Sequence, residues 1–196
     1  GIKHWDRPFA GSSAFVWSSS FTNGVSVSTD SGGTFTGANG TENNELPSLA
    51  VNATIQLSDT TVMAGLDPDT APGEGGAYWS PDEGATPWVK GLGTESTTDD
   101  VVEFAEVEAN GDVLCVVQGD GTTEGGVYLS GDKGRHWTAL NTDLDTADQT
   151  VTDIIESTEE PVTYYIGTAT DGVYGNTIEA NPYPTVSSVD ASSGPS

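Results

Sequence analysis

The sequence predicts an all-β protein built from about four similar repeats, each containing about four short strands. Three observations support this prediction: a short turn phrase recurs at intervals of about 50 residues, β-branched and aromatic runs precede each copy, and no stretch shows a helical apolar period. Because repeats of this length bury their apolar surface mainly against their neighbours, we expect the units to stack in a row.

The turn phrase has the form Ser-x-Asp-x-Gly, followed by an aromatic residue. An aspartate accepts hydrogen bonds from nearby backbone amides and a glycine adopts a positive φ at little cost, so each copy is expected to form a tight hairpin. The closing aromatic is expected to fill the gap between neighbouring units. The second copy has one extra residue before its aromatic, which predicts a slightly wider turn. The copies comprise Ser28, Asp30, Gly32 and Phe35; Ser80, Asp82, Gly84 and Trp88; and Ser130, Asp132, Gly134 and Trp137.

Strand-like runs precede every turn. The strands directly before the turns are expected at 24–27, 76–79 and 126–129, and a fourth copy at 172–175 lacks the turn phrase. Earlier runs in the units lie at 15–17, 51–57, 61–63, 101–104, 113–117, 151–155 and 163–166. With the segment after the turn, a unit holds about four strands, which is the composition of a β-propeller blade.

The three hairpins resemble the Asp box, also called the BNR repeat, of sialidase-like β-propellers. The resemblance covers roughly residues 14–178 and implies about four four-stranded blades, as a closed four-bladed ring or as part of a larger propeller. In that family the boxes lie at blade edges, away from the ligand face, so the resemblance implies a structural role for them. The family includes sialidases, other glycoside hydrolases, sortilin-type receptors and photosystem assembly factors, and therefore implies no single activity.

Two expected domains are a propeller over 1–180 and a separate segment over 181–196. Residues 2–6 resemble the strand after the third turn, so we expect the N-terminal segment to complete the last blade and close the ring; a cut within a longer array is the alternative. The segment 181–196 resembles the opening strand of an IPT/TIG immunoglobulin-like domain, with a Ser/Pro linker as the alternative.

The chain carries 30 acidic and 5 basic residues, a formal net charge of −25. The strand-like patterning argues against a disordered acidic segment. At molar salt the Debye length is about 3 Å, so repulsion among acidic side chains on the surface is largely screened. Such a surface is therefore expected in a high-salt environment. An ordinary acidic secreted protein is the alternative. Phosphate-mediated binding of nucleic acid or anionic lipid is not expected.

No apolar run is long enough for a membrane-spanning helix. The single cysteine, Cys115, is expected to be a buried structural thiol.

Catalysis is not expected. Sialidases hold their substrate carboxylate with three arginines, whereas this chain has only Arg7 and Arg135. Glycoside hydrolysis needs only two carboxylates, so it remains the alternative. Half a calcium loop occurs at 143–148, so incidental calcium or sodium binding stays open, but no metal site or other cofactor is expected. Weak candidates for ligand contacts are Trp17, Tyr164, Tyr165, Asp120 and Asp171.

The sequence therefore favours a non-catalytic structural or adhesive propeller on a cell or virion surface, or otherwise extracellular, that presents a protein- or glycan-binding face and can assemble into a larger complex. Two alternatives stay open. One is a fragment of a glycan-active glycoside hydrolase, and the other is an assembly factor or receptor propeller that binds a protein partner.

Overall fold

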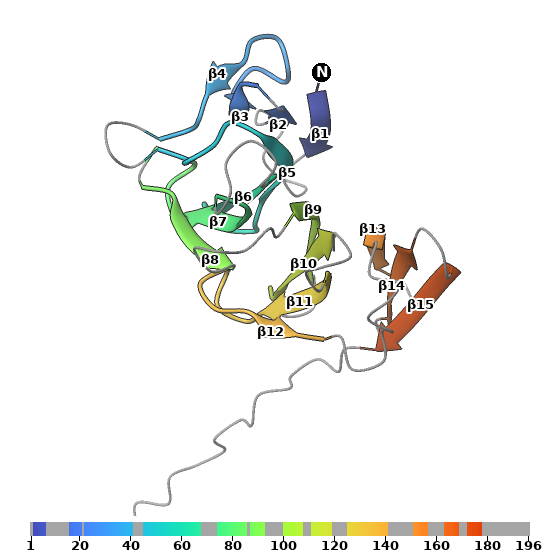
Figure 1. Ribbon diagram of the computed structural model, residues 1–196. Coiled ribbons are helices and arrows are strands. Elements are labelled where there is room, and N and C mark those ends of the chain that lie inside the picture. Colours follow the sequence, from blue (N-terminus) through green and yellow to red (C-terminus); the bar gives the residue numbers. More distant parts are fainter. Residues whose placement is uncertain are drawn as a thin grey trace, which may run out of the picture.

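The computed structural model describes residues 2–6, 16–20, 22–40, 45–67, 74–85, 87–92, 100–107, 111–118, 125–140, 151–156, 163–168 and 172–177. The regular elements in these ranges are all β-strands, which confirms the all-β class. The strands form four antiparallel sheets that follow one another along an open arc (Figure 1). In these ranges we find no helix with the length and apolar character needed to cross a membrane.

The first two sheets are meanders in which each strand pairs with the next one in the chain. Short β-branched runs separated by Gly, Asn and Asp turns produce this connectivity, because tight turns join only antiparallel neighbours. Sheet 1 contains β1 (Ile2–Asp6), β2 (Val16–Ser20), β3 (Gly24–Ser28) and β4 (Thr36–Gly37). Sheet 2 contains β5 (Val51–Gln56), β6 (Val62–Leu66), β7 (Gly76–Ser80) and β8 (Val89–Leu92).

The last two sheets follow the same order. Sheet 3 contains β9 (Asp100–Glu106), β10 (Val113–Gln118), β11 (Gly126–Ser130) and β12 (Thr138–Ala139). Sheet 4 contains β13 (Val151–Glu156), β14 (Thr163–Thr168) and β15 (Gly172–Thr177). Within the described residues sheet 4 has three strands, as expected for a last repeat that lacks the turn phrase. The 181–196 segment lies outside the described residues.

The pairing of the N-terminal strand corrects one expectation. Strand β1 pairs with β2, with Trp5 opposite Ser18, and is therefore the first strand of sheet 1. It does not complete sheet 4, where β13, β14 and β15 pair in chain order. The likeness of 2–6 to the strand after the third turn was misleading, because a local similarity of sequence does not determine which distant strand is its partner.

The four sheets share one register, so equivalent positions can be assigned. Near the start of the first strand of each sheet lie the equivalent residues Ile2, Val51, Val101 and Val151, which pair with Ser20, Leu66, Val117 and Thr168. In every sheet a register irregularity follows this first pair. The repeat is therefore preserved in the details of strand pairing as well as in the hairpins.

The core consists of three apolar layers, one between each pair of successive sheets. The second strands of sheets 2 and 3 are buried on both faces: all five residues of β6 and the first five of β10 are buried, including Cys115 as expected. We call the face of a sheet that is turned toward the next sheet its front face, and the opposite face its rear face. The front faces are represented by Trp17 and Val25 in sheet 1, Met63 and Ala77 in sheet 2, and Leu114 and Val127 in sheet 3.

Contact between successive sheets is very close at Gly65 of β6. A Cβ built on Gly65 of β6 would lie 2.7 Å from Cβ of Val101 in the next sheet. Val101 therefore occupies the space that a side chain at position 65 would need. Because real Cβ atoms do not approach so closely, any larger residue at position 65 would push β9 away from sheet 2.

Candidate functional site

Hairpin 1 (residues 28–35) is organised by a serine and an aspartate. The Ser28 hydroxyl donates to the Asp30 carboxylate at 2.7 Å and accepts from the Gly32 amide at 2.8 Å. Asp30 also accepts from the Thr34 amide at 2.7 Å and from the Thr34 hydroxyl at 2.8 Å. These bonds, with the Thr34 amide contributing most and the Ser28 hydroxyl next, lower the pKa of Asp30 to about 2. The carboxylate therefore holds the turn together.

Hairpin 3 (residues 130–137) has the same arrangement. The Ser130 hydroxyl donates to Asp132 at 3.0 Å and accepts from the Gly134 amide at 2.8 Å, while Asp132 accepts from the His136 amide at 2.8 Å. Burial alone would raise the pKa of Asp132, but hydrogen bonds from the His136 ring, the His136 amide and Ser130 outweigh it and hold the pKa below its usual value.

Hairpin 2 (residues 80–88) shares the backbone geometry of the other two hairpins. Its Ala85 amide donates to the Asp82 carbonyl at 2.8 Å, and the Glu83 amide donates to the Thr60 carbonyl at 3.1 Å. In all three hairpins the residue before the glycine of the turn phrase also has a positive φ: 61° at Ser31, 49° at Glu83 and 61° at Lys133. The phrase predicted a positive φ only for the glycine, because nothing about these three side chains signals a left-handed backbone.

The closing aromatics behave in two ways. Trp88 is buried and its Nε1 donates to the Ala38 carbonyl of sheet 1 at 3.1 Å. Trp137 is partly buried against the apolar layer between sheets 2 and 3. Phe35, by contrast, is exposed, so the expectation that it fills a gap between blades is wrong for hairpin 1. The reason is positional: these aromatics pack on the preceding sheet, and sheet 1 is the first in the array.

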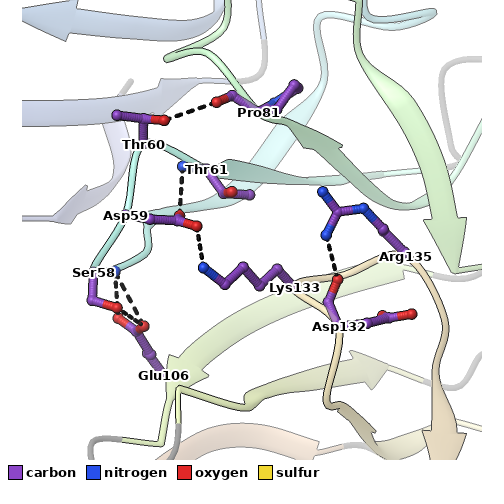
Figure 2. A network of polar contacts seen from close by, with 9 residues as sticks. All are labelled: Ser58, Asp59, Thr60, Thr61, Pro81, Glu106, Asp132, Lys133 and Arg135. Carbon is purple, nitrogen blue, oxygen red and sulfur yellow. Dashed lines mark hydrogen bonds and ion pairs between the residues drawn. The ribbon is translucent and has the colours of Figure 1, made fainter.

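A polar network joins sheets 2 and 3 at the loop between β5 and β6 (Figure 2). In this network Lys133 of hairpin 3 forms an ion pair with Asp59. The Ser58 hydroxyl donates to the Glu106 carboxylate at 2.7 Å. Burial would raise the pKa of Asp59, but the hydrogen bonds from Lys133 and Thr61 hold it below its usual value. The network therefore fixes hairpin 3 against the preceding sheet.

The other described cations lie over aromatic rings. The Arg135 guanidinium lies 4.4 Å from the centre of the Trp79 ring, which belongs to sheet 2, and its Nη1 donates to the Asp132 carbonyl at 2.8 Å. The Lys90 ammonium lies 5.8 Å from the centre of the Tyr78 ring. These contacts place basic side chains in the packing of the sheets.

The aromatic candidates for ligand contacts differ in accessibility. Trp17 is fully buried between sheets 1 and 2, where its Nε1 donates to Gln56 at 2.9 Å. Tyr164 is buried between sheets 3 and 4. Neither residue has a surface on which a ligand could stack, because each supplies core to a sheet boundary. Tyr165 points the other way and is exposed. Asp120 and Asp171 lie outside the described residues.

The structure places Glu103 within electrostatic range of Asp153, a pair that the sequence did not single out. Glu103 of β9 and Asp153 of β13 occupy equivalent positions on the first strands of neighbouring sheets. Burial, together with the nearby negative charge of Asp153, raises the pKa of Glu103 to about 7 against an opposing hydrogen bond from Phe104. The chain has 30 acids, so only the register of distant strands could reveal this pair. Among the described residues no group of three or more metal-ligating side chains is present.

Comparisons with known proteins support the fold. No protein-family model and no curated protein matches the sequence. The structure is similar to a GH74 enzyme from Niastella koreensis (TM-score 0.62, 19% identity, 90% of this chain and 28% of that one) and to YCF48 bound to D1 peptide (TM-score 0.53, 12% identity, 86% and 48%). It is also similar to the computationally designed Ika8 protein (TM-score 0.57, 16% identity, 90% and 45%). The chain thus spans less than half the length of each. At these identities the likeness concerns the fold alone, and it shows a β-propeller type of architecture.

Proposed function

We propose that this chain is a non-catalytic β-propeller module with a structural or adhesive role at a cell or virion surface in a high-salt environment. It presents a face to a protein or glycan partner and needs no cofactor. The resemblance of the hairpins to Asp boxes supports the structural role, because hairpins 1 and 3 use their acids to stabilise turns.

The observation that carries this proposal is the engagement of the basic side chains. Of the five basic residues in the chain, the structure describes the side chains of Lys90, Lys133 and Arg135. Each is engaged in an ion pair or a ring contact, and two of them connect sheet 3 to sheet 2. A cation held in this way is not free to clamp an anionic substrate, and binding one would release a contact between sheets.

The net charge of −25 constrains the partner. At molar salt the charge is screened within about 3 Å, so recognition there depends on hydrogen bonds and apolar contacts. A propeller of similar fold, YCF48, has been solved bound to a peptide, which supports a protein partner for a chain with this architecture. The same charge disfavours nucleic acid at low salt.

The test measures binding and turnover together. In molar KCl, the chain is mixed with sialosides, β-glucans and envelope proteins of halophilic cells; released reducing ends and saturable binding are recorded. We expect binding to at least one protein or glycan and no hydrolysis above a heat-denatured control. Turnover of any glycan, or the absence of binding throughout the panel, would contradict the proposal.

The high-salt environment has its own test. Because screening relieves repulsion among acidic side chains, the melting temperature is expected to rise with KCl up to the molar range. An uncharged osmolyte at equal osmolality serves as the control. A melting temperature that does not rise with KCl, or that rises equally with the osmolyte, would remove this part of the proposal.

A second candidate function is glycoside hydrolysis, favoured by Glu103 and Asp153. A carboxyl group with a pKa of about 7 that lies within electrostatic range of a second carboxylate is the combination that a general acid and its partner require. If this candidate is correct, Glu103→Gln abolishes glycan hydrolysis and activity falls as pH rises through about 7, whereas Glu45→Gln, at an exposed loop position, changes neither. If the unmodified chain has no measurable glycan hydrolysis, this candidate function is wrong.

The same pair makes a prediction for stability that does not depend on activity. Because the pKa of Glu103 rises from 4.5 to about 7 on folding, the folded state holds its proton more tightly than the unfolded chain. Stability from this group is therefore present below pH 4.5 and is lost as pH rises toward 7. Glu103→Gln should remove this decline in melting experiments. An unchanged pH profile in that variant would show that Glu103 has an ordinary pKa.

A further inference from the structure

We propose that residues 183–186, which lie outside the described residues, add a short fourth strand to the outer edge of sheet 4, with Tyr183 as its closing aromatic. The inference goes beyond the proposed function and does not depend on it. It rests on the register of the described strands, because in sheets 1, 2 and 3 the fourth strand follows the third one at nearly constant spacing.

The outer edge of sheet 4 differs from the edges of the other sheets. In sheets 1, 2 and 3 the third strand lies between two others, and its outer partner is β4, β8 or β12. In the part of the chain that the structure describes, β15 is the outermost strand of sheet 4 (Figure 1). Proteins usually cover such an edge, because its backbone groups pair with extended segments that come near. The sequence continues beyond β15 to residue 196.

The spacing after β15 leads to an aromatic residue. Asn176 of β15 is equivalent to Ser28 of β3 and Ser130 of β11, because each lies opposite the equivalent residue of the second strand in its sheet. In hairpins 1 and 3 the closing aromatic follows this serine by seven residues. The residue seven positions after Asn176 is Tyr183. Tyr183 therefore has the position of a closing aromatic, although the turn phrase is missing.

The residues after Tyr183 match as well. In sheets 1 and 3 the third residue after the closing aromatic is apolar, and its amide donates to a carbonyl of the third strand. These bonds join Ala38 to Val25 at 2.9 Å and Leu140 to Val127 at 2.8 Å. The third residue after Tyr183 is Val186, and the residue of β15 equivalent to Val25 and Val127 is Val173. The register therefore places Val186 opposite Val173.

The closing aromatics of sheets 2 and 3 pack on the sheet before their own, and this assigns a place to Tyr183. Trp88 of hairpin 2 donates from Nε1 to the Ala38 carbonyl of sheet 1 at 3.1 Å. Leu140 is the equivalent of Ala38 in sheet 3, and it is partly buried at the edge of the layer between sheets 3 and 4. The Tyr183 ring therefore lies on Leu140, where it extends this apolar layer.

The composition of the segment suits an outer strand. Pro184 has the position at which β4 and β12 begin. Proline is tolerated at the first residue of a strand and on a sheet edge, because no ladder hydrogen bond is then lost. Residues 180–189 include no charged side chain, in a chain with a net charge of −25. Docking of this segment therefore adds no acidic group to the edge of sheet 4.

The turn before Tyr183 does not repeat the other hairpins. Ile178 has the position of the aspartate and Ala180 that of the glycine. At the equivalent glycine of hairpin 2, Gly84, an added Cβ would lie 2.7 Å from the Ala38 carbonyl oxygen, so the same geometry has no room for an alanine. The proposal is therefore confined to the aromatic and the strand. Contacts with β15 and sheet 3 hold this segment, whereas local hydrogen bonds hold hairpins 1 and 3.

Disulfide cross-linking tests the position of the strand. A chain with Val173→Cys and Val186→Cys is compared with a chain with Val173→Cys and Val189→Cys, while the native Cys115 is fully buried and does not compete. Opposite residues of antiparallel strands have Cα atoms about 4.5–5.5 Å apart, which a disulfide spans. We expect the disulfide with position 186 to form at least about tenfold faster, since the small difference in loop length alone changes closure little.

Two outcomes of the cross-linking would overturn the proposal. Equal rates for the two chains under folding conditions would show that the segment does not dock in this register. A rate difference that persists in concentrated urea would show that the preference for position 186 does not come from folded structure.

Aspartate substitutions test whether the strand stabilises the chain. Val186→Asp should lower the melting temperature by about 2–4 °C, because it places a charge in an apolar contact beside β15. Val189→Asp, three residues further along, is the matched control and should change the melting temperature by less than about 1 °C. If neither substitution lowers the melting temperature, the segment is a linker and the proposal is wrong. Equal losses would also contradict it, because they would indicate a longer strand that belongs to a separate domain.

A double-mutant comparison tests the place of the aromatic ring. Tyr183→Ala and Leu140→Ala should each lower the melting temperature. Together they should lower it by less than the sum of the two shifts, because the second substitution removes a contact that is already lost. Additive shifts would show that Tyr183 does not pack on Leu140 and would overturn its assignment as the closing aromatic of sheet 4.

Discussion

Hairpins 1 and 3 have nearly the same local structure but different surroundings. In both, the serine hydroxyl accepts from the glycine amide at 2.8 Å, and the aspartate accepts from an amide four residues later at 2.7 and 2.8 Å. Hairpin 3, however, is pressed against sheet 2, where a Cβ on Gly134 would lie 2.5 Å from Met63 Cε, whereas one on Gly32 meets nothing within 4 Å. Correspondingly, Trp137 packs in the core and Phe35 is exposed.

This difference separates two sources of stability. The serine and aspartate bonds are formed within about seven residues and need no neighbouring sheet. Burial of the closing aromatic requires a preceding sheet, as does the ion pair between Lys133 and Asp59. A hairpin of this type is therefore a complete local structure that becomes a joint between sheets only when another sheet lies behind it.

The largest expected difference concerns the closing aromatics. Trp137→Ala should lower the free energy of unfolding by about 3 kcal/mol, because it removes a partly buried ring from the layer between sheets 2 and 3. Phe35→Ala should cost less than about 1 kcal/mol, since the ring is exposed. Denaturant titration measures both. Equal costs would mean that the exposure of the closing ring does not decide its contribution to stability.

The glycines should show a smaller difference. Gly32 and Gly134 have φ of 91° and 85°, so alanine at either position should cost about 1 kcal/mol in backbone strain. Gly134→Ala should cost about 1 kcal/mol more, because its Cβ displaces the end of Met63. Repeating both substitutions in a Met63→Ala background is the control. If the excess persists there, the cause is not the contact with Met63.

The aspartates allow a comparison by pH. The pKa of Asp30 is lowered from 3.8 to about 2 and that of Asp132 is also lowered, so both groups contribute stability that is present above pH 3.8 and is lost at lower pH. For Asp30 the loss extends to about pH 2. Carboxyl carbon NMR should give a midpoint near 2 for Asp30. Thr34→Val, which removes the hydroxyl that Asp30 accepts at 2.8 Å and keeps the amide, should raise this midpoint. A midpoint near 3.8 in the unmodified chain would show that the hairpin bonds do not form in solution.

The smallest effect isolates the ion pair. Ser31 and Lys133 both have φ of 61°, so glycine relieves the same backbone strain at each position. Ser31→Gly should therefore stabilise the chain slightly, by less than about 1 kcal/mol. The stabilisation by Lys133→Gly should be smaller, because this substitution also removes the ion pair with Asp59. The difference between the two variants should disappear in molar KCl. A difference that survives high salt would indicate a contribution from packing.

Several features could be predicted from particular residues. The β-branched runs indicated the strands, and the spacing of Asp30, Asp82 and Asp132 indicated the repeat, because hydrogen bonds to nearby amides and positive φ angles depend on a few consecutive residues. The burial of Cys115 followed from the apolar run around it. The three-stranded last sheet followed from the absence of a fourth turn phrase.

Other features depended on which distant segments meet. The sequence did not reveal that β1 pairs with β2, that Glu103 lies near Asp153, or that Phe35 is exposed while Trp88 is buried. Equivalent residues in the repeat have the same local preferences, yet their burial differs because the first and last sheets each have a neighbour on one side only. Short-range hydrogen bonding therefore determined the hairpins and strands from the sequence alone. Only the tertiary structure decided which faces are covered, since burial depends on surfaces supplied by residues far away in the chain.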